Sequence, residues 1–69
     1  MLDKEIENWF TYHAPNSTQL PRYQIIRDTA KVLAKCILEN TPASADQSAS
    51  IRLLREAVMT ANAAIACEE

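Results

Sequence analysis

Residues 21–40 read PRYQIIRDTAKVLAKCILEN, and this stretch decides the fold because its apolar residues recur at helical spacing. A step of about 100° per residue places one narrow apolar stripe on this helix, formed by Ile26, Ala30, Leu33 and Ile37. A second apolar stripe lies roughly 100° away and consists of Ile25, Val32 and Cys36. One stripe is enough for a helix to lie on one neighbour, so two stripes predict two neighbours.

A second long helix is predicted for about residues 44–67. Pro42 cannot continue the first helix, and Ser44 followed by Gln47 has the spacing of a capping box. The second helix has an apolar seam that matches the first, formed by Ile51, Leu54, Val58, Ala61 and Ile65. Its solvent-exposed side is indicated by Arg52, Arg55 and Glu56. Because the connection is short, the two helices should form an antiparallel hairpin in an all-α fold.

The N-terminal part is predicted as a short helix over about residues 2–9 and a loop over residues 10–20. With the two long helices it makes a single helical-hairpin domain over residues 1–69. A domain of this size buries only about 60% of its unfolded surface and is marginal alone. The uncovered stripe, together with a strip of small residues on the second helix, therefore predicts assembly into a compact homo-oligomer.

The composition narrows the classes of function. The formal net charge is −2 at pH 7, which disfavours a general duplex-DNA binder. Cys36 and Cys67 lack CxxC spacing and are expected to be free thiols rather than metal ligands. The start MLDKEIEN does not resemble a signal peptide, and no apolar run reaches about 18 residues, so we expect a cytosolic protein without a membrane segment.

Catalysis has little support in the sequence. There is one histidine without a nearby nucleophilic cysteine or serine, no HExxH motif and no paired-carboxylate motif. The chain has no glycine from which a phosphate-cradling loop could be built. We therefore expect a binding protein without enzymatic activity and without a cofactor.

Three of the four aromatic residues and the only histidine stand together around the first loop. Trp9 and Phe10 are interpreted as a plug at the end of the helical core. Tyr12 and His13 fall at the loop tip, where a planar ring beside cations is what a nucleobase stacks on. Packing within the fold is the alternative explanation for Tyr12 and His13, and it is the more common one for loop aromatics.

The first long helix carries a basic edge of Arg27, Lys31 and Lys35, spaced four residues apart beside the first apolar stripe. Two explanations stay open: a site for a small anion, and a solvated face on which Asp28 pairs with Lys31. Thr29 lies on the other side of the stripe, about 160° from Arg27. Arg27 and Thr29 therefore cannot serve one small pocket within a single protomer.

Several runs of the sequence resemble one family. They are FTYHAP at residues 10–15, the spacing of Arg22, Tyr23, Ile26 and Arg27, AKVLA at residues 30–34, and REAVMTANAAIA at residues 55–66. Each run is short, but together, in this order and in so short a chain, they are fairly specific. Over roughly residues 10–66 the chain resembles the phage anti-CBASS cyclic-oligonucleotide sponges.

The resemblance implies both an assembly and a function. Such proteins are compact homohexamers of helical hairpins that bind cyclic dinucleotides such as 3′,3′-cGAMP and, in many members, cyclic trinucleotides. These ligands are the signals of bacterial CBASS immunity. The sponges hold the signal without cleaving it and so keep it from its effector. The resemblance thus implies a protein of the cytoplasm of the infected bacterial host.

The resemblance also implies ligand-binding residues. The dinucleotide site lies between two protomers and uses the tyrosine of FTYH, here Tyr12, with a cation fifteen residues later. That cation is Arg27 here, in the place of a lysine in the family, and Lys31 one turn on could add a second positive charge. The cyclic trinucleotide site is separate and involves Thr29. The family has a basic residue directly after ANAAIA, where this chain has Cys67, so the resemblance supports the dinucleotide site more strongly.

Two other functions remain as alternatives. A small oligomeric helical protein-interaction module would dock a host or phage protein on its exposed stripe and need no nucleotide ligand. Such a module would tolerate Phe or Leu in place of Tyr12. A nucleic-acid accessory protein would use the basic edge, but the negative net charge disfavours DNA as a partner.

Overall fold

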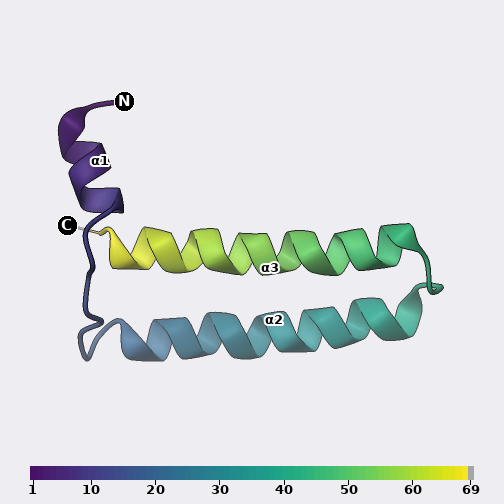
Figure 1. Ribbon diagram of the computed structural model, residues 1–69. Coiled ribbons are helices and arrows are strands. Elements are labelled where there is room, and N and C mark those ends of the chain that lie inside the picture. Colours follow the sequence, from purple (N-terminus) through teal and green to yellow (C-terminus); the bar gives the residue numbers. More distant parts are fainter. Residues whose placement is uncertain (69) are drawn as a thin grey trace.

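The computed structural model describes residues 1–68 and contains three helices (Figure 1): α1 (Asp3–Trp9), α2 (Leu20–Asn40) and α3 (Ala45–Ala66). The two long helices lie antiparallel and side by side, and α1 points away from the end of the pair at which α2 begins and α3 ends (Figure 1). No β-strand occurs within residues 1–68. The predicted all-α helical hairpin with a short N-terminal helix is therefore confirmed.

The limits of α2 follow from its local sequence. The helix begins at Leu20, one residue before the predicted start, with Pro21 in its first turn. Proline fits there because its fixed φ suits a helix and its missing N–H would have no helical partner. At the other end the chain leaves the helix at Thr41, whose backbone is extended at φ −128° and ψ 152°, and Pro42 prevents any continuation.

The turn between α2 and α3 differs from the predicted capping box in one respect. The Gln47 N–H donates to the Ser44 Oγ at 3.1 Å, as predicted, and α3 begins at Ala45. The Gln47 side chain, however, reaches back to α2, and its Nε2 donates to the carbonyl oxygens of Leu38 at 3.2 Å and Thr41 at 3.1 Å. The last carbonyls of a helix lack helical partners, and the Gln47 side chain supplies one at the end of α2. Because Gln47 itself stands in the first turn of α3, it holds the end of α2 and the start of α3 together.

The seam between α2 and α3 uses small and branched apolar residues. On α3 it follows the predicted pattern, with Ile65 buried and Ile51, Leu54, Val58 and Ala61 half-buried. On α2 the half-buried apolar positions are Ile26, Ala30, Ala34 and Ile37. Leu33, which the stripe pattern assigned to the seam, is 47% exposed. Ala30 and Ala34 are small and allow α3 to approach α2 closely. The larger Leu33 therefore lies beside this contact and not within it.

The hairpin is one helix layer thick. Its principal extents are 44 × 29 × 13 Å, and the shortest is close to the roughly 10–12 Å diameter of one helix with its side chains. The Cα radius of gyration is 15.2 Å, against about 11 Å for a compact domain of this length. The accessible surface is 5604 Å², about 1,300 Å² more than a compact monomer of this mass exposes.

The second apolar stripe of α2 is left exposed by the rest of residues 1–68. Ile25 and Val32 are 64% and 70% exposed, and Cys36 is exposed as well. Ile65 is the only buried apolar residue in the part of the chain that the structure describes. None of the helices within residues 1–68 is long and apolar enough to cross a membrane. The homo-oligomer stays a prediction, and its physical reason is that a stable core needs two layers of secondary structure.

A buried glutamine closes the open end of the hairpin. Gln19, directly before α2, is 7% exposed, and its Nε2 donates to the Ile65 carbonyl at 3.0 Å and the Glu68 carboxylate at 3.2 Å. Its Oε1 accepts a hydrogen bond from the Asn16 N–H at 3.1 Å. The Ile65 carbonyl belongs to the last turn of α3, where helical partners are missing. One amide therefore links the linker, the start of α2 and the end of α3.

An ion pair strengthens the same closure. Both terminal nitrogens of Arg22 donate to the Glu68 carboxylate, at 2.7 and 3.1 Å. The hydrogen bond from Arg22, followed by that from Gln19, lowers the pKa of the Glu68 carboxyl below its ordinary value. The hydrogen bond to Glu68, followed by the attraction of its charge, raises the pKa of the Arg22 guanidinium. The two side chains are 48% and 41% exposed, so solvent screens part of this attraction.

Replacing Gln19 with leucine should lower the free energy of unfolding by about 1–3 kcal/mol, because the Ile65 carbonyl and the Asn16 N–H would each lose a partner. Urea unfolding at one fixed protein concentration measures the effect, since assembly would make stability depend on concentration. Gln24→Leu is the matched control, because Gln24 is exposed and bonds only side chains of its own helix. Equal stability of the two variants would contradict the closing role of Gln19.

The Glu68 carboxylate should make stability depend on pH in the acid range. Its pKa is lower in the folded than in the unfolded chain, so its contribution is present above the unfolded pKa of about 4.3 and is lost as the pH falls through the folded value. Glu68→Gln should therefore be less stable than the wild type at pH 7 and approach it below about pH 4. Urea unfolding at several pH values measures the difference.

Glu39→Gln is the control for this pH series, because it removes an exposed carboxylate of α2 that lies outside the closing network. A gap between wild type and Glu68→Gln that stayed constant down to strongly acid pH would mean that the ionised carboxylate is not what stabilises the closure.

Candidate functional site

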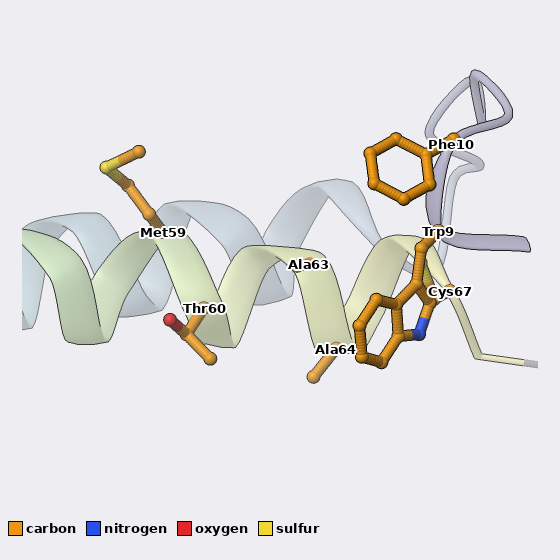
Figure 2. Close-up of a pocket in the computed structure, with 7 residues that line it drawn as sticks. All are labelled: Trp9, Phe10, Met59, Thr60, Ala63, Ala64 and Cys67. Atoms are coloured by element: carbon orange, nitrogen blue, oxygen red, sulfur yellow. The ribbon is translucent and has the colours of Figure 1, made fainter. Parts of the chain in front are cut away.

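Among the grooves on the surface formed by residues 1–68, three are large enough to consider as binding sites. Two lie on opposite flanks of the α2–α3 seam and share the seam residues Ala30, Leu54 and Val58. The third lies where the end of α1 and the start of the linker meet the last turns of α3 (Figure 2). By their linings we name them the basic groove, the apolar groove and the terminal groove.

The basic groove combines cations with an apolar floor in a volume of about 260 Å³. Arg27 and Lys31 line it from α2, and Arg55 lines it from α3. Its other lining residues are apolar: Ala30, Ala34, Ile51, Leu54, Val58 and Met59. Lys35, the third cation of the predicted basic edge, lines none of the three grooves.

The three cations of the basic groove have no carboxylate partner within residues 1–68, where the one ion pair lies at the open end of the hairpin. Arg27 donates to the Gln24 Oε1 at 3.1 Å, and the Gln24 amide in turn donates to Asp28 at 2.8 Å. Asp28 is thus bonded to Gln24, and the pairing of Asp28 with Lys31 on a solvated face is not formed. The groove therefore carries uncompensated positive charge.

Arg55 is the lining cation that the sequence pattern does not indicate, because its spacing places it on the solvent-exposed side of the second helix. It follows the seam residue Leu54 and precedes Met59 by one turn, which places it on the flank that faces Arg27 and Lys31. Its position next to the seam residue Leu54 could have indicated that Arg55 lies near the α2–α3 contact. Choosing between the two flanks, however, requires the register of α3 against α2, which only the fold supplies.

The apolar groove lies on the other flank of the seam and has a volume of about 430 Å³. Thr29 is the one polar residue among its nine lining residues. Arg27 and Thr29 therefore line grooves on opposite flanks of the seam, as their angular separation on the helix requires. The structure does not bring them together in one chain.

The terminal groove has a volume of about 550 Å³ and is mostly apolar. Its lining residues come from the end of α1, the start of the linker and the last turns of α3 with the residue that follows them: Trp9, Phe10, Met59, Thr60, Ala63, Ala64 and Cys67. Figure 2 shows the Trp9 ring beside the last turn of α3, near Ala64 and Cys67, and the Phe10 ring on the same side of α3 as Met59. Trp9 is 56% and Phe10 is 83% exposed. The interpretation of both rings as a plug of the core is therefore wrong, because a single layer of helices has no enclosed end.

Tyr12 stands in the linker between two residues that are bonded to α1. The Thr11 Oγ1 donates to the Glu7 carbonyl, and the His13 Nε2 donates to the Asn8 carbonyl at 2.7 Å. The His13 ring thus holds the linker in place, whereas Tyr12 is 85% exposed. None of the three grooves is lined by both Tyr12 and Arg27. The two predicted dinucleotide residues are therefore not brought together in any of these grooves.

The linker is also fixed to the end of α3. The Asn8 Nδ2 donates to the Cys67 carbonyl at 2.9 Å, and the Cys67 thiol donates to the Asn8 carbonyl at 3.7 Å. Cys67 is half-buried. It stands at the position where the anti-CBASS sponges, which the sequence resembles, carry a basic residue. Asn8 therefore connects the segment that carries Tyr12 to the hairpin itself.

The arrangement of the basic groove determines what it can do chemically. A flat ligand can lie on its apolar floor while the rim cations bind anionic groups by charge and by hydrogen bonds. Its nine lining residues include no carboxylate and no imidazole. Their cations and apolar side chains are therefore suited to holding a flat anion.

A comparison with known protein families found a match that covers most of the chain. The family described as Acb2/Tad1, hairpin domain, matches residues 2–66, which is nearly the whole chain. No curated protein and no solved structure matches the chain. The match confirms the resemblance to the anti-CBASS sponges and supports, at the level of the family, an anti-CBASS role in binding cyclic oligonucleotides. This helical hairpin belongs to the Acb2/Tad1 hairpin-domain family.

Proposed function

We propose that the protein sequesters cyclic dinucleotide immune signals such as 3′,3′-cGAMP, without cleaving them, in the cytoplasm of the infected bacterial host. CBASS effectors then remain inactive because their signal is bound elsewhere. The observation that carries the proposal is the basic groove, in which uncompensated cations surround an apolar floor. Membership of the Acb2/Tad1 family supports the same class of ligand.

The proposed dinucleotide site takes residues from two protomers. Tyr12, exposed in the linker of one protomer, stacks on a base, and a stacked base contributes about 1–3 kcal/mol. Arg27 and Lys31 of a neighbouring protomer bind phosphate, with the planar guanidinium of Arg27 donating two parallel hydrogen bonds. Placing the ring and the cations on different protomers agrees with their separation within one chain.

The proposed assembly is a homo-oligomer, and the resemblance implies a hexamer. Two features of the single chain support self-association: the excess accessible surface of about 1,300 Å² and the uncovered stripe of Ile25, Val32 and Cys36. Stable protein interfaces bury about 800 Å² per partner. The uncovered surface is therefore large enough for at least one stable contact between copies.

Sequestration without catalysis follows from the character of the ligand and of the site. A cyclic dinucleotide has little conformational freedom to lose on binding, so a preformed groove can hold it tightly. The lining of the basic groove combines cations, which bind phosphate, with apolar side chains, and it includes no Asp, Glu or His that would activate water. The ligand is therefore held intact and can be released intact.

A second ligand site is proposed in the apolar groove around Thr29, for cyclic trinucleotides. Thr29 is the one polar residue in that lining, so its hydroxyl is the group that can orient a polar ligand there. Cys67 takes the place of the family's basic residue, and its thiol and carbonyl are both bonded to Asn8. We therefore expect weaker binding of cyclic trinucleotides than of cyclic dinucleotides.

The terminal groove favours the alternative of a protein-interaction module. It is the largest of the three grooves, and its seven lining residues include no Asp, Glu, Lys, Arg or His. Exposed aromatic residues of this kind are enriched at protein interfaces. On this alternative the protein needs no nucleotide, and Tyr12 is interchangeable with Leu.

The proposal predicts a saturable complex of fixed stoichiometry between the purified protein and 3′,3′-cGAMP, formed by a homo-oligomer. Calorimetry with a panel of cyclic di- and trinucleotides measures affinity, and native mass spectrometry measures the assembly and the bound ligand. Heat denaturation should release the ligand unchanged, as chromatography can determine. A well-folded protein that binds no member of the panel, or that returns a cleaved ligand, would rule the proposal out.

Tyr12→Ala should weaken dinucleotide binding roughly 5- to 150-fold, because one stacked base is lost. Arg27→Ala should also weaken it, because a phosphate loses a charged donor. Tyr12→Phe keeps the ring and should bind, and Lys35→Ala removes a cation of the same helix outside the grooves and should bind. Native mass spectrometry should find all four variants assembled. Wild-type affinity of Tyr12→Leu for the dinucleotide would instead show that Tyr12 does not stack on a base, and would overturn this site assignment.

A further inference from the structure

The basic groove carries cations on both of its banks. Arg27 and Lys31 belong to α2 and Arg55 belongs to α3, so the apolar floor over the seam lies between them. Three of the seven Lys and Arg residues of the chain thus line one groove, which has no Asp or Glu in its lining, although the net charge of the chain is −2. The groove is therefore positively charged, although the chain as a whole carries a negative net charge.

Arg55 is available to a ligand. Its side chain is exposed and has no carboxylate partner within residues 1–68. Glu56, the next residue, lies about 100° further around α3, on the side away from the groove. Like charges around an apolar floor repel one another, and an anion bound between them removes the repulsion. The groove is therefore complementary to a ligand with negative charge on both banks.

We propose that Arg55 binds one phosphate of the cyclic dinucleotide while Arg27 and Lys31 bind the other, an inference that rests on the proposed function. A cyclic dinucleotide carries two phosphodiesters on opposite sides of one ring, each negatively charged at neutral pH. Packed helices lie about 8–10 Å apart, so a ring that spans the seam places one phosphate on each bank. The fork of Arg55 then donates two parallel hydrogen bonds to the second phosphate.

Calorimetry with 3′,3′-cGAMP at low and high ionic strength tests this role in four proteins: wild type, Arg55→Gln, Arg55→Lys and Arg52→Gln. Arg55→Gln should bind at least about tenfold more weakly, because a charged hydrogen bond is lost. Its affinity should also depend less on salt, because fewer charges attract the ligand. Arg55→Lys keeps the charge without the fork and should recover part of the affinity. Arg52→Gln removes an equal charge outside the grooves and should bind as the wild type does.

The outcomes distinguish this inference from the proposed function. Wild-type affinity and wild-type salt dependence of Arg55→Gln would overturn the role of Arg55, while binding by the wild type would leave the proposed function standing. Absence of binding by the wild type itself would overturn both. If native mass spectrometry found that Arg55→Gln no longer assembled as the wild type does, the lost assembly would account for its weaker binding, and the assignment of Arg55 to the second phosphate would be overturned.

Discussion

The thickness of the hairpin is the constraint on which the other features depend. At 13 Å the chain is a single layer of helices, and one layer cannot enclose a core. The consequences are visible along α2, where Ile25 and Val32 remain exposed although the spacing of their neighbours is that of a packed helix. The same flatness leaves grooves on both flanks of the seam, so ligand surface and subunit surface are drawn from one limited set of residues.

The helices could be predicted from the sequence because the signals that define them are local. The spacing of Ile51, Leu54 and Val58 and the break at Pro42 are properties of short segments, and they indicated the hairpin. Leu33 and Ala34 were harder to place, because which of two adjacent residues enters the seam depends on how α3 is rotated against α2. The spacing of apolar residues along the sequence does not specify how the two helices are rotated against each other.

The candidate site was predictable only in part, for the same reason. Arg27 and Lys31 were found because a basic edge repeats along one helix, whereas Arg55 belongs to the other helix and joins them only through the register of the pair. The exposure of Trp9 and Phe10 could not be foreseen from composition, which favours burial of such rings when a core exists. Tyr12 lies outside every groove described above, and its pairing with Arg27 concerns more than one copy of the chain.

The glutamine that spans the turn has a kinetic consequence. Because the Gln47 amide reaches Leu38 and Thr41, the first contacts between the two long helices join residues that are close along the chain. Closing so short a loop takes well under a microsecond, and helical topologies rich in local contacts fold fast. The two long helices can therefore pair progressively, from the turn toward their other ends, before two copies of the chain meet. Encounter between copies then becomes the slow, concentration-dependent step of maturation.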